Sequence, residues 1–264
     1  MQLVTLTTDW GYSDFFAGMV KGRLYSLIPD VQVVDITHGV EPFSKNRATF
    51  VVRNACMCFP HGTIHIIDVD SYETRNNPFL VIRYDGQYFI CADNGIPSAV
   101  FYGKGDEIEI YQLSLFQDSN FFTFASYNLF CFAAEHIALG RPLEDIGYKR
   151  SALAPYTPMG NSGYDNRVEV MVAYIDSYGN AYLNLKYDEF ETIRHGRKLS
   201  IRLDSYTKKP IKLSLGYTDS VDSGEGGMVM TVSATGYLQI AMLHTSAERL
   251  LGLKVGRKVT VFFE

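Results

Sequence analysis

The sequence contains little that would commit the chain to a disulfide framework or a metal site. It has only 4 cysteines in 264 residues, and they form no C-x-x-C pair and no Cys/His set at zinc spacing. Cys56, Cys58 and Cys131 lie in apolar stretches, where a free cysteine packs as a small hydrophobic residue. We therefore expect free thiols in a reducing compartment.

Long hydrophobic runs and a surplus of positive charge are also missing. No stretch approaches the roughly 20 apolar residues of a membrane span, and the apolar N-terminal segment is too short for a signal peptide and lacks a basic region. The 24 basic and 29 acidic residues are interspersed and give a net charge of -5, so no basic face is available for a run of phosphates. The expected protein is cytoplasmic and binds neither membranes nor nucleic acid.

Apolar and aromatic side chains, in contrast, are plentiful. Hydrophobic residues make up 47% of the chain, enough to bury a core, and the length suits one large domain or two modest ones. The 18 tyrosines and 17 phenylalanines are a large share, so we expect most of them in the core or at a subunit interface and some in a pocket.

The first part of the sequence alternates between strand and helix patterns. The expected strands are residues 3–7, 31–36 and 64–69, and the expected helices are residues 15–27, 47–58 and, later, 129–139. Residues 79–84 and 88–90, around Asp85-Gly86-Gln87, predict a hairpin. Because a βαβαβ run places its strands in one direction, we expect an α/β domain with a mostly parallel central sheet, covered on both faces.

The second part is different in character. Residues 151–166 are rich in proline, glycine and small polar residues and predict a linker, with a domain boundary near 160. We place the N-terminal domain at residues 1–158 and the second at 165–264. Short strands with Gly-rich turns are expected at 168–175, 199–203, 211–215, 228–232, 238–243 and 258–263, with one helix at 246–251. This pattern is typical of a small all-β, barrel-like domain.

Asp9 follows the first expected strand, at the carboxyl edge where parallel sheets bind ligands. A carboxylate there can accept both hydroxyls of a ribose diol. The alternative role is an N-cap for the next helix, for which Asp14 is better placed. Asp35 and His38, after the second strand, form at most a weak metal signal with these two residues, and a histidine at such a place is more often hydrogen-bonded.

Two further strand ends carry polar residues. Asp68, Asp70, Glu73 and Arg75 follow the third strand and form either one site with an acidic pair and a cation, or a solvated turn. Asn94, in Asp93-Asn94-Gly95, aims an amide at the same edge or belongs to a simple turn. In the second domain, Tyr178 and Asn180 offer an aromatic face and an amide, the groups that recognise a purine.

Taken in order, these segments resemble the S-adenosyl-L-methionine hydrolase (hydroxide adenosyltransferase) family, whose relatives include fluorinases and chlorinases. The matching segments are 7–14 (T-T-D-W-G-x-x-D), 34–38 (V-D-I-T-H), 59–65 (F-P-x-G-T-x-H), 93–95 (D-N-G), 175–180 (I-D-x-Y-G-N) and 233–241 (S-x-x-G-Y-L-x-I-A). The match spans nearly the whole chain, and so many motifs in order form a specific signal.

The resemblance implies a homotrimer that binds S-adenosyl-L-methionine between the N-terminal domain of one subunit and the C-terminal domain of the next. Water would attack the ribose C5′ to give adenosine and L-methionine, without a metal or other cofactor. The implied substrate-binding residues are Asp9 at the ribose, Asp14 and Asp176 toward methionine, Trp10 and Phe43 as walls, Tyr178 and Asn180 at adenine, and also Tyr72 and Asn94.

The chain departs from the family at the residues that would activate the water, for which the family uses an Asp, an Arg and a His. Arg75 matches the Arg, but its loop is two residues shorter, so the Asp is Asp70 or Asp68; Asp70 is preferred because shortening a loop disturbs the strand least. Ala125 replaces the His and cannot relay a proton, while Ser126 matches a fluorinase serine.

Three hypotheses follow from this departure. The first is a hydrolase in which Asp70 and Arg75 hold the water, with Ser126 or Tyr72. The second is a non-catalytic binder of adenosine-containing ligands, and the third is an enzyme for another nucleoside-like substrate. Met242 and His244 also stand where relatives place other groups beside adenine.

Overall fold

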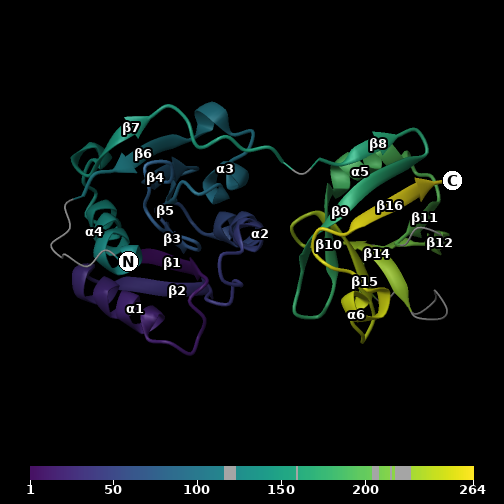
Figure 1. The fold of residues 1–264 in the computed structure, drawn as a ribbon, viewed down its shortest axis with the longest axis horizontal. Coiled ribbons are helices and arrows are strands. Elements are labelled where there is room, and N and C mark those ends of the chain that lie inside the picture. Colours follow the sequence, from purple (N-terminus) through teal and green to yellow (C-terminus); the bar gives the residue numbers. More distant parts are fainter. Residues whose placement is uncertain (116–122, 159, 204–207, 215, 218–226) are drawn as a thin grey trace. The chain divides into compact units, whose positions relative to one another are not determined.

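The computed structural model describes residues 1–115, 123–158, 160–203, 208–214, 216–217 and 227–264, in two compact units, Met1–Pro158 and Met159–Glu264 (Figure 1). Each unit has its own sheet and its own apolar core. No helix among these residues is long and apolar enough to cross a membrane.

Unit 1 is built on a seven-stranded sheet. Its strands, in chain order, are β1 (Gln2–Thr8), β2 (Val31–Thr37), β3 (Ile64–Asp68), β4 (Phe79–Tyr84), β5 (Gln87–Ala92), β6 (Glu109–Leu113) and β7 (Gly147–Arg150). In space they follow the order β2-β1-β3-β5-β4-β6-β7. The first four strands of this order are parallel, and β4, β6 and β7 continue the sheet in antiparallel pairs.

The prediction of a mostly parallel sheet is therefore wrong, and the sheet is mixed. The cause is the short turn between β4 and β5, where Asp85 and Gly86 both have positive φ, 46° and 66°. Two consecutive residues in this conformation make the tight turn that reverses the chain, so β4 can only pair antiparallel with β5. The predicted hairpin at this place is confirmed.

Helices pack on both faces of this sheet (Figure 1). On one face, α1 (Phe16–Leu27) and α4 (Cys131–Ala138) contribute to a core that includes Leu24 and Phe130. On the other, α2 (Lys45–Ala55) and α3 (Ile96–Val100) bury Val52 and Val100. Burying one such side chain stabilises the fold by about 1.5–3 kcal/mol, so these faces hold the helices on the sheet. The single turns are η1 (Cys56–Cys58), η2 (Gly105–Glu107), the π-helical η3 (Ser126–Phe130) and η4 (Leu143–Asp145).

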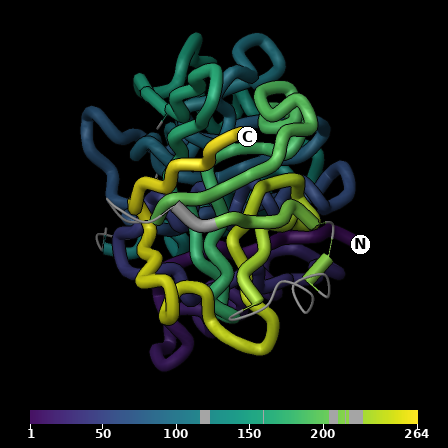
Figure 2. The backbone as a smooth tube through the Cα atoms, turned by 90° about the vertical axis from the view of Figure 1, so that its right-hand side faces the viewer, coloured from purple at the N-terminus to yellow at the C-terminus, as the bar shows by residue number. Residues whose placement is uncertain are grey.

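Unit 2 is mostly β structure that curls into a nearly barrel-shaped sheet (Figure 2). Its strands are β8 (Ser162–Tyr164), β9 (Arg167–Ile175), β10 (Ala181–Lys186), β11 (Leu199–Arg202), β12 (Lys208–Ile211), β13 (Leu213–Ser214), β14 (Met228–Val232), β15 (Tyr237–Met242) and β16 (Lys258–Phe263). Along β9, Val168, Val170 and Val172 are buried and alternate with more exposed residues, as expected for a strand with one face on a core. Two helices, α5 (Tyr187–Arg194) and α6 (Ala247–Leu251), accompany the strands, and only the second was expected from the sequence.

Candidate functional site

Asp9 lies just beyond β1, and its carboxylate links the loop after β1 to the loops that contain Phe43 and Asp70. Its Oδ2 accepts the backbone N–H of Phe43 at 2.9 Å and that of Asp70 at 3.2 Å. The capping alternative is excluded, because α1 begins after Phe15 without any side-chain cap, and Asp14 is exposed. Asp9 therefore organises the carboxyl edge of the sheet, with its Oδ1 free of hydrogen bonds to the described residues.

Asp68, the last residue of β3, is the buried carboxyl group of this edge. It lies opposite Thr8 in the parallel pair of β3 and β1, and its side chain is 6% exposed. The Ser126 hydroxyl, itself fully buried in η3, donates a hydrogen bond to Asp68 Oδ2. Burial raises the pKa of Asp68 to about 6, and the nearby charge of Asp9 adds to this shift against the hydrogen bond from Ser126.

Asp70 occupies a different environment from Asp68. Its backbone is left-handed, with φ 49°, and its carboxylate forms an ion pair with Lys45 at 3.0 Å. The Asn94 amide donates to the carbonyl groups of Val69 and Asp70, at 2.9 and 3.0 Å. In this structure Asn94 thus uses its N–H groups to hold the loop backbone.

Aromatic residues occur next to Asp9 and in the loops whose backbone it binds, with Trp10 directly after it in the chain. The Trp10 ring stacks on His38 at a centroid distance of 5.6 Å and meets Phe124 edge-on at 5.1 Å. Phe43 is 72% exposed and Tyr72 is 54% exposed, so both present free ring surface. Trp10 and Phe43 are the two rings that the resemblance predicts as walls, and that role stays a prediction.

Arg75 lines a cavity of unit 1, of about 700 Å³, together with Asp93, Lys149 and Arg150. Arg150 pairs there with the buried Asp93 at 3.3 Å. No hydrogen bond or ion pair joins Arg75 to Asp68, Asp70 or Ser126, all of which the structure describes. The three residues predicted as catalytic are therefore not brought into one hydrogen-bonded cluster.

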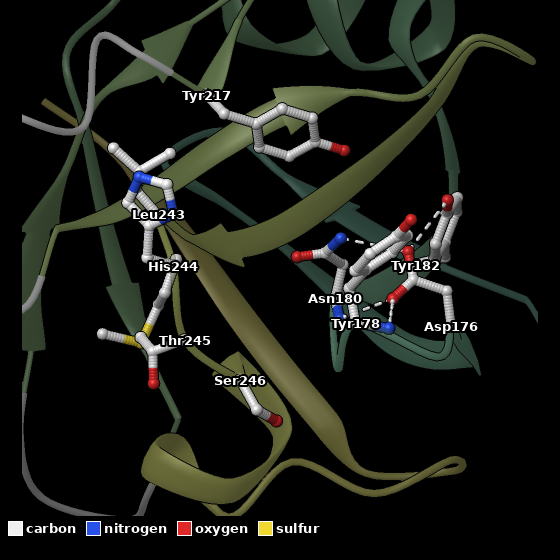
Figure 3. A pocket seen from close by; sticks show the side chains of 10 residues that line it. Asp176, Tyr178, Asn180, Tyr182, Tyr217, Leu243, His244, Thr245 and Ser246 are labelled. Atoms are coloured by element: carbon white, nitrogen blue, oxygen red, sulfur yellow. Dashed lines mark hydrogen bonds between the residues drawn. The ribbon is translucent and has the colours of Figure 1, made fainter.

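In unit 2, Asp176 organises the turn between β9 and β10 (Figure 3). Its carboxylate accepts the backbone N–H groups of Tyr178 and Asn180, at 3.0 and 2.9 Å, and the Asn180 side-chain amide at 3.0 Å. The Tyr182 hydroxyl lies 3.4 Å away, and burial with the charge of Asp176 raises the pKa of Tyr182 to about 12. Asp176 thus fixes the shape of the turn, while the Tyr178 ring stays 79% exposed.

This turn forms one wall of a pocket of about 620 Å³. The lining residues are Asp176, Tyr178, Asn180, Tyr182, Tyr217, Met242, Leu243, His244, Thr245 and Ser246. His244 faces the turn from the opposite side (Figure 3). The resemblance had placed Met242 and His244 at positions that lie beside adenine in relatives, but sequence reasoning did not place Tyr182, Tyr217, Leu243, Thr245 or Ser246 in the site.

A metal site is not formed by the described side chains. No group of three or more His, Cys, Asp or Glu residues in the described part of the chain is arranged to hold a metal ion. Asp35 instead pairs with Lys21 at 2.5 Å, and His38 contacts Thr8 at 2.7 Å.

Comparisons with known proteins agree on one family. Relatives include a protein named (R)-S-adenosyl-L-methionine hydrolase from Methanocaldococcus jannaschii, 22% identical with 100% of this chain and 97% of the relative covered, and another of that name from Salinispora tropica, 26% identical with 98% and 97% covered. A fluorinase from Actinopolyspora mzabensis is 24% identical, with 98% and 96% covered.

A solved structure of an uncharacterized conserved protein from Thermotoga maritima has the same fold, with a TM-score of 0.87, 24% identity, and 98% and 99% of the two chains covered. Residues 4–147 match the model of the SAM hydroxide adenosyltransferase N-terminal domain, and residues 170–260 match that of its C-terminal domain. The two matches together take in most of both units, including Asp9, Asp68 and the Asp176 turn. The chain therefore belongs to the S-adenosyl-L-methionine hydroxide adenosyltransferase family.

Proposed function

We propose that this protein binds S-adenosyl-L-methionine and hydrolyses it to adenosine and L-methionine. The observation that carries the proposal is the buried Asp68, hydrogen-bonded by Ser126 and adjacent to Asp9 at the carboxyl edge of the sheet. A carboxyl group with a pKa of about 6 is suited to accept a proton from water near neutral pH. The membership of both units in one family, with relatives named for this hydrolysis, supports the substrate.

The proposed step is a displacement at carbon. The oxygen of water forms a bond to C5′ of the ribose while the C5′–S bond breaks, and the electron pair stays on sulfur, which becomes the neutral thioether of methionine. The proton of water passes to a protein base. Because the positive charge of the sulfonium is lost, a site that excludes water favours the reaction, and aromatic faces such as Trp10 and Phe43 attract the cation. No metal or cofactor takes part in the proposed step.

We propose Asp68, rather than Asp70, as the carboxylate that receives the proton. Asp70 is neutralised by Lys45, whereas Asp68 has a raised pKa and a hydroxyl partner. Ser126 would orient the water through its oxygen, in place of the histidine that Ala125 replaces. Arg75, whose guanidinium has no partner among the described residues, is proposed to orient the water or the substrate, with Tyr72 beside it.

The binding roles follow from the free polar atoms and rings. We propose that the unused Oδ1 of Asp9 accepts the ribose hydroxyls, that Asp14 faces methionine, and that Tyr178 and Asn180 hold adenine. Asp176, with both oxygens engaged within its turn, is proposed to act on the ligand by shaping that turn.

We also propose a cytoplasmic homotrimer, in which the Asp9 loops of one subunit and the Tyr178 turn of the next complete the site. Each unit carries only some of the proposed binding residues. Those for the ribose and the sulfonium are in unit 1, and those for adenine are in unit 2. Light scattering on the purified protein tests the oligomer, and a monomeric form should bind adenosine poorly.

The activity is tested by incubating the protein with S-adenosyl-L-methionine and following adenosine by chromatography. Product formation should exceed that of Asp9→Ala, and equal rates for the two proteins would reject hydrolysis at this site. The second candidate, a non-catalytic adenosine binder, is favoured by Ala125. Calorimetry separates the two, because heat of binding without any product supports the binder, and no binding rejects both.

A further inference from the structure

His38 follows β2 and is buried directly behind Trp10. Its side chain is 1% exposed, and its ring lies nearly parallel to the indole, with an interplanar angle of 16°. Tyr12 meets the same imidazole edge-on at 5.4 Å. Among the residues that the structure describes, Trp10 has ring contacts with His38 at its face and with Phe124 at an edge.

The two ring nitrogens of His38 have separate partners. Nδ1 lies 2.7 Å from the Thr8 hydroxyl, and Nε2 lies 3.2 Å from Asp35 Oδ1. The second contact is electrostatic, since its alignment is not that of a hydrogen bond. A carboxylate only accepts, so the neutral ring carries its hydrogen on Nε2 and its Nδ1 accepts from Thr8.

Asp35 is in turn held by Lys21 of α1, at 2.5 Å. Burial favours the neutral form of His38 and lowers its pKa, against the opposing charge of Asp35, while Lys21 lowers it further. For Asp35, burial alone would raise the pKa, but Lys21 and His38 lower it, so the carboxylate stays charged beside a neutral ring. Within the described part of the chain, Asp35 and Lys21 are the charged groups that shift the pKa of His38.

Hydrogen bonds to the His38 backbone join the loop after β1 to the loop after β2. The Gly11 N–H donates to the His38 carbonyl at 2.8 Å, and the His38 N–H donates to the Tyr12 hydroxyl at 3.1 Å. The Trp10 side chain is also close enough to the Asp68 carboxyl group to lower its pKa slightly, against the larger effect of burial. Trp10 therefore contacts His38 through its ring face and lies near the carboxyl group proposed to take the proton.

We propose that His38 is a positioning residue, whose neutral ring fixes the Trp10 indole as a wall of the nucleoside site and sets its N–H against Asp68. Thr8 and Asp35 fix the orientation of the ring, and Lys21 fixes Asp35. The part of this proposal that concerns ligand affinity rests on the proposed function, whereas the part that concerns Trp10 does not.

Trp10 is the only tryptophan in the chain, so tryptophan emission reports this site alone. Emission and acrylamide quenching are measured on the ligand-free, full-length protein. His38→Asn keeps an acceptor for Thr8 but removes the ring; we expect emission at longer wavelength and about a twofold rise in the quenching constant, because one indole face loses its cover. His38→Phe keeps a ring there and should retain emission close to wild type.

Asp35→Asn supplies a milder second variant, since it leaves the His38 ring in place and lies at a partly exposed position. It should raise the quenching constant less than His38→Asn does. Glu107→Gln is the matched control: it breaks a comparable ion pair with Lys104, at 3.2 Å, that has no link to Trp10, and it should change nothing. Melting curves and circular dichroism identify any variant that fails to fold.

Calorimetry with adenosine then measures the consequence for binding. His38→Asn should bind about tenfold more weakly, which corresponds to about 1.4 kcal/mol, and His38→Phe should bind more tightly than His38→Asn. If folded His38→Asn or Asp35→Asn shows wild-type Trp10 quenching, the positioning role is rejected. If the wild type binds no adenosine, the proposed function fails, while the quenching result still decides the role of His38.

Discussion

The carboxyl group of Asp68 is buried, and burial disfavours its charged form. In the unfolded chain its pKa has the ordinary value of 3.8, and in the folded protein burial, the largest cause, raises the pKa to about 6. Folding therefore favours the protonated form. The contribution of protonated Asp68 to the free energy of unfolding is complete below pH 3.8 and is lost as pH rises through 6. At neutral pH the charged Asp68 therefore destabilises the fold. Such a cost is common where function needs a poised group.

The first prediction is that Asp68→Asn stabilises the protein above pH 6. Asparagine can still accept from the Ser126 hydroxyl but carries no charge, so it avoids a cost of about 3 kcal/mol for a shift of about two pKa units. Thermal unfolding at pH 7.5 should show a higher melting temperature than wild type, with little difference near pH 4. A lower melting temperature at pH 7.5 would contradict the raised pKa of Asp68.

The second prediction concerns the pH dependence of adenosine formation. If Asp68 accepts the proton of water, the rate should rise with pH and level off above about 6, the pKa of its carboxyl group. Asp68→Asn should reduce the rate by roughly 10²- to 10⁴-fold. Rates are measured by chromatography between pH 5 and 8, in the range where melting curves show folded protein.

Asp70→Asn is the matched comparison for this profile, because it removes a carboxylate two residues away that is paired with Lys45. It should keep the rise near pH 6. If the rise in rate near pH 6 is lost in Asp70→Asn and kept in Asp68→Asn, Asp70 and not Asp68 is the residue that accepts the proton.

At this scale the sequence identifies residue types but not their partners. Asp9 can be placed at a strand end from the apolar pattern alone. Asp68 and Asp70 cannot be separated by counting along a shortened loop, since the separation depends on the left-handed backbone of Asp70, which leaves its carboxylate beside Lys45. The contact of Ser126 with Asp68 joins residues 58 positions apart and requires the packing of η3 on the sheet.

The turn between β9 and β10 is the element on which the proposed adenine site depends. Gly179 has φ +82°, and a Cβ at this position would lie 2.1 Å from Ser246 Oγ and 3.1 Å from Ser246 Cα. Ser246 is itself fixed, because its Oγ caps α6 by accepting the Arg249 N–H at 3.1 Å. Any side chain at Gly179 must therefore displace either the turn or the start of α6.

The third prediction is that Gly179→Ala destabilises unit 2 by about 1–3 kcal/mol or more, from overpacking added to an unfavourable φ. It should also weaken adenosine binding in calorimetry, since Tyr178 and Asn180 flank the displaced residue. Gly256→Ala is the control: it has φ +83° with no heavy atom within 4 Å of the added Cβ, so it carries the backbone strain alone. Equal losses in both variants would show that the contact with Ser246 is unimportant.

Strands and helices with strong local patterns are predicted well, and those defined by their neighbours are not. The hairpin is confirmed because β4 and β5 are apolar and joined by a turn sequence. β6 and β7 were not expected, since Glu109, Tyr148 and Lys149 give them a mixed polar pattern that becomes a strand only by pairing with β4 and with each other. These two strands extend the antiparallel part of the sheet, which begins with the hairpin of β4 and β5.

At the scale of the whole molecule, the two units hold separate cores. Leu24 and Phe130 belong to one core of unit 1, and Leu183 and Phe190 to the core of unit 2, and no described residue belongs to cores of both units. Chains built in this way commonly unfold in more than one step. A ligand that contacts groups from both units would raise the stability of each in proportion to its binding.

The fourth prediction is that calorimetry resolves two unfolding transitions in the ligand-free protein. Leu24→Ala, which truncates a fully buried side chain of α1, should lower one transition by the equivalent of about 2–5 kcal/mol, and Gly179→Ala should lower the other. Adenosine should raise the transition of unit 2, whose pocket is proposed to hold adenine, and also that of unit 1, where Asp9 is proposed to hold the ribose. Asp9→Ala should reduce the adenosine-induced rise of the unit 1 transition more than that of the unit 2 transition. If adenosine raises only the transition that Gly179→Ala lowers, the ribose is not held by Asp9, and the site is confined to the pocket of unit 2.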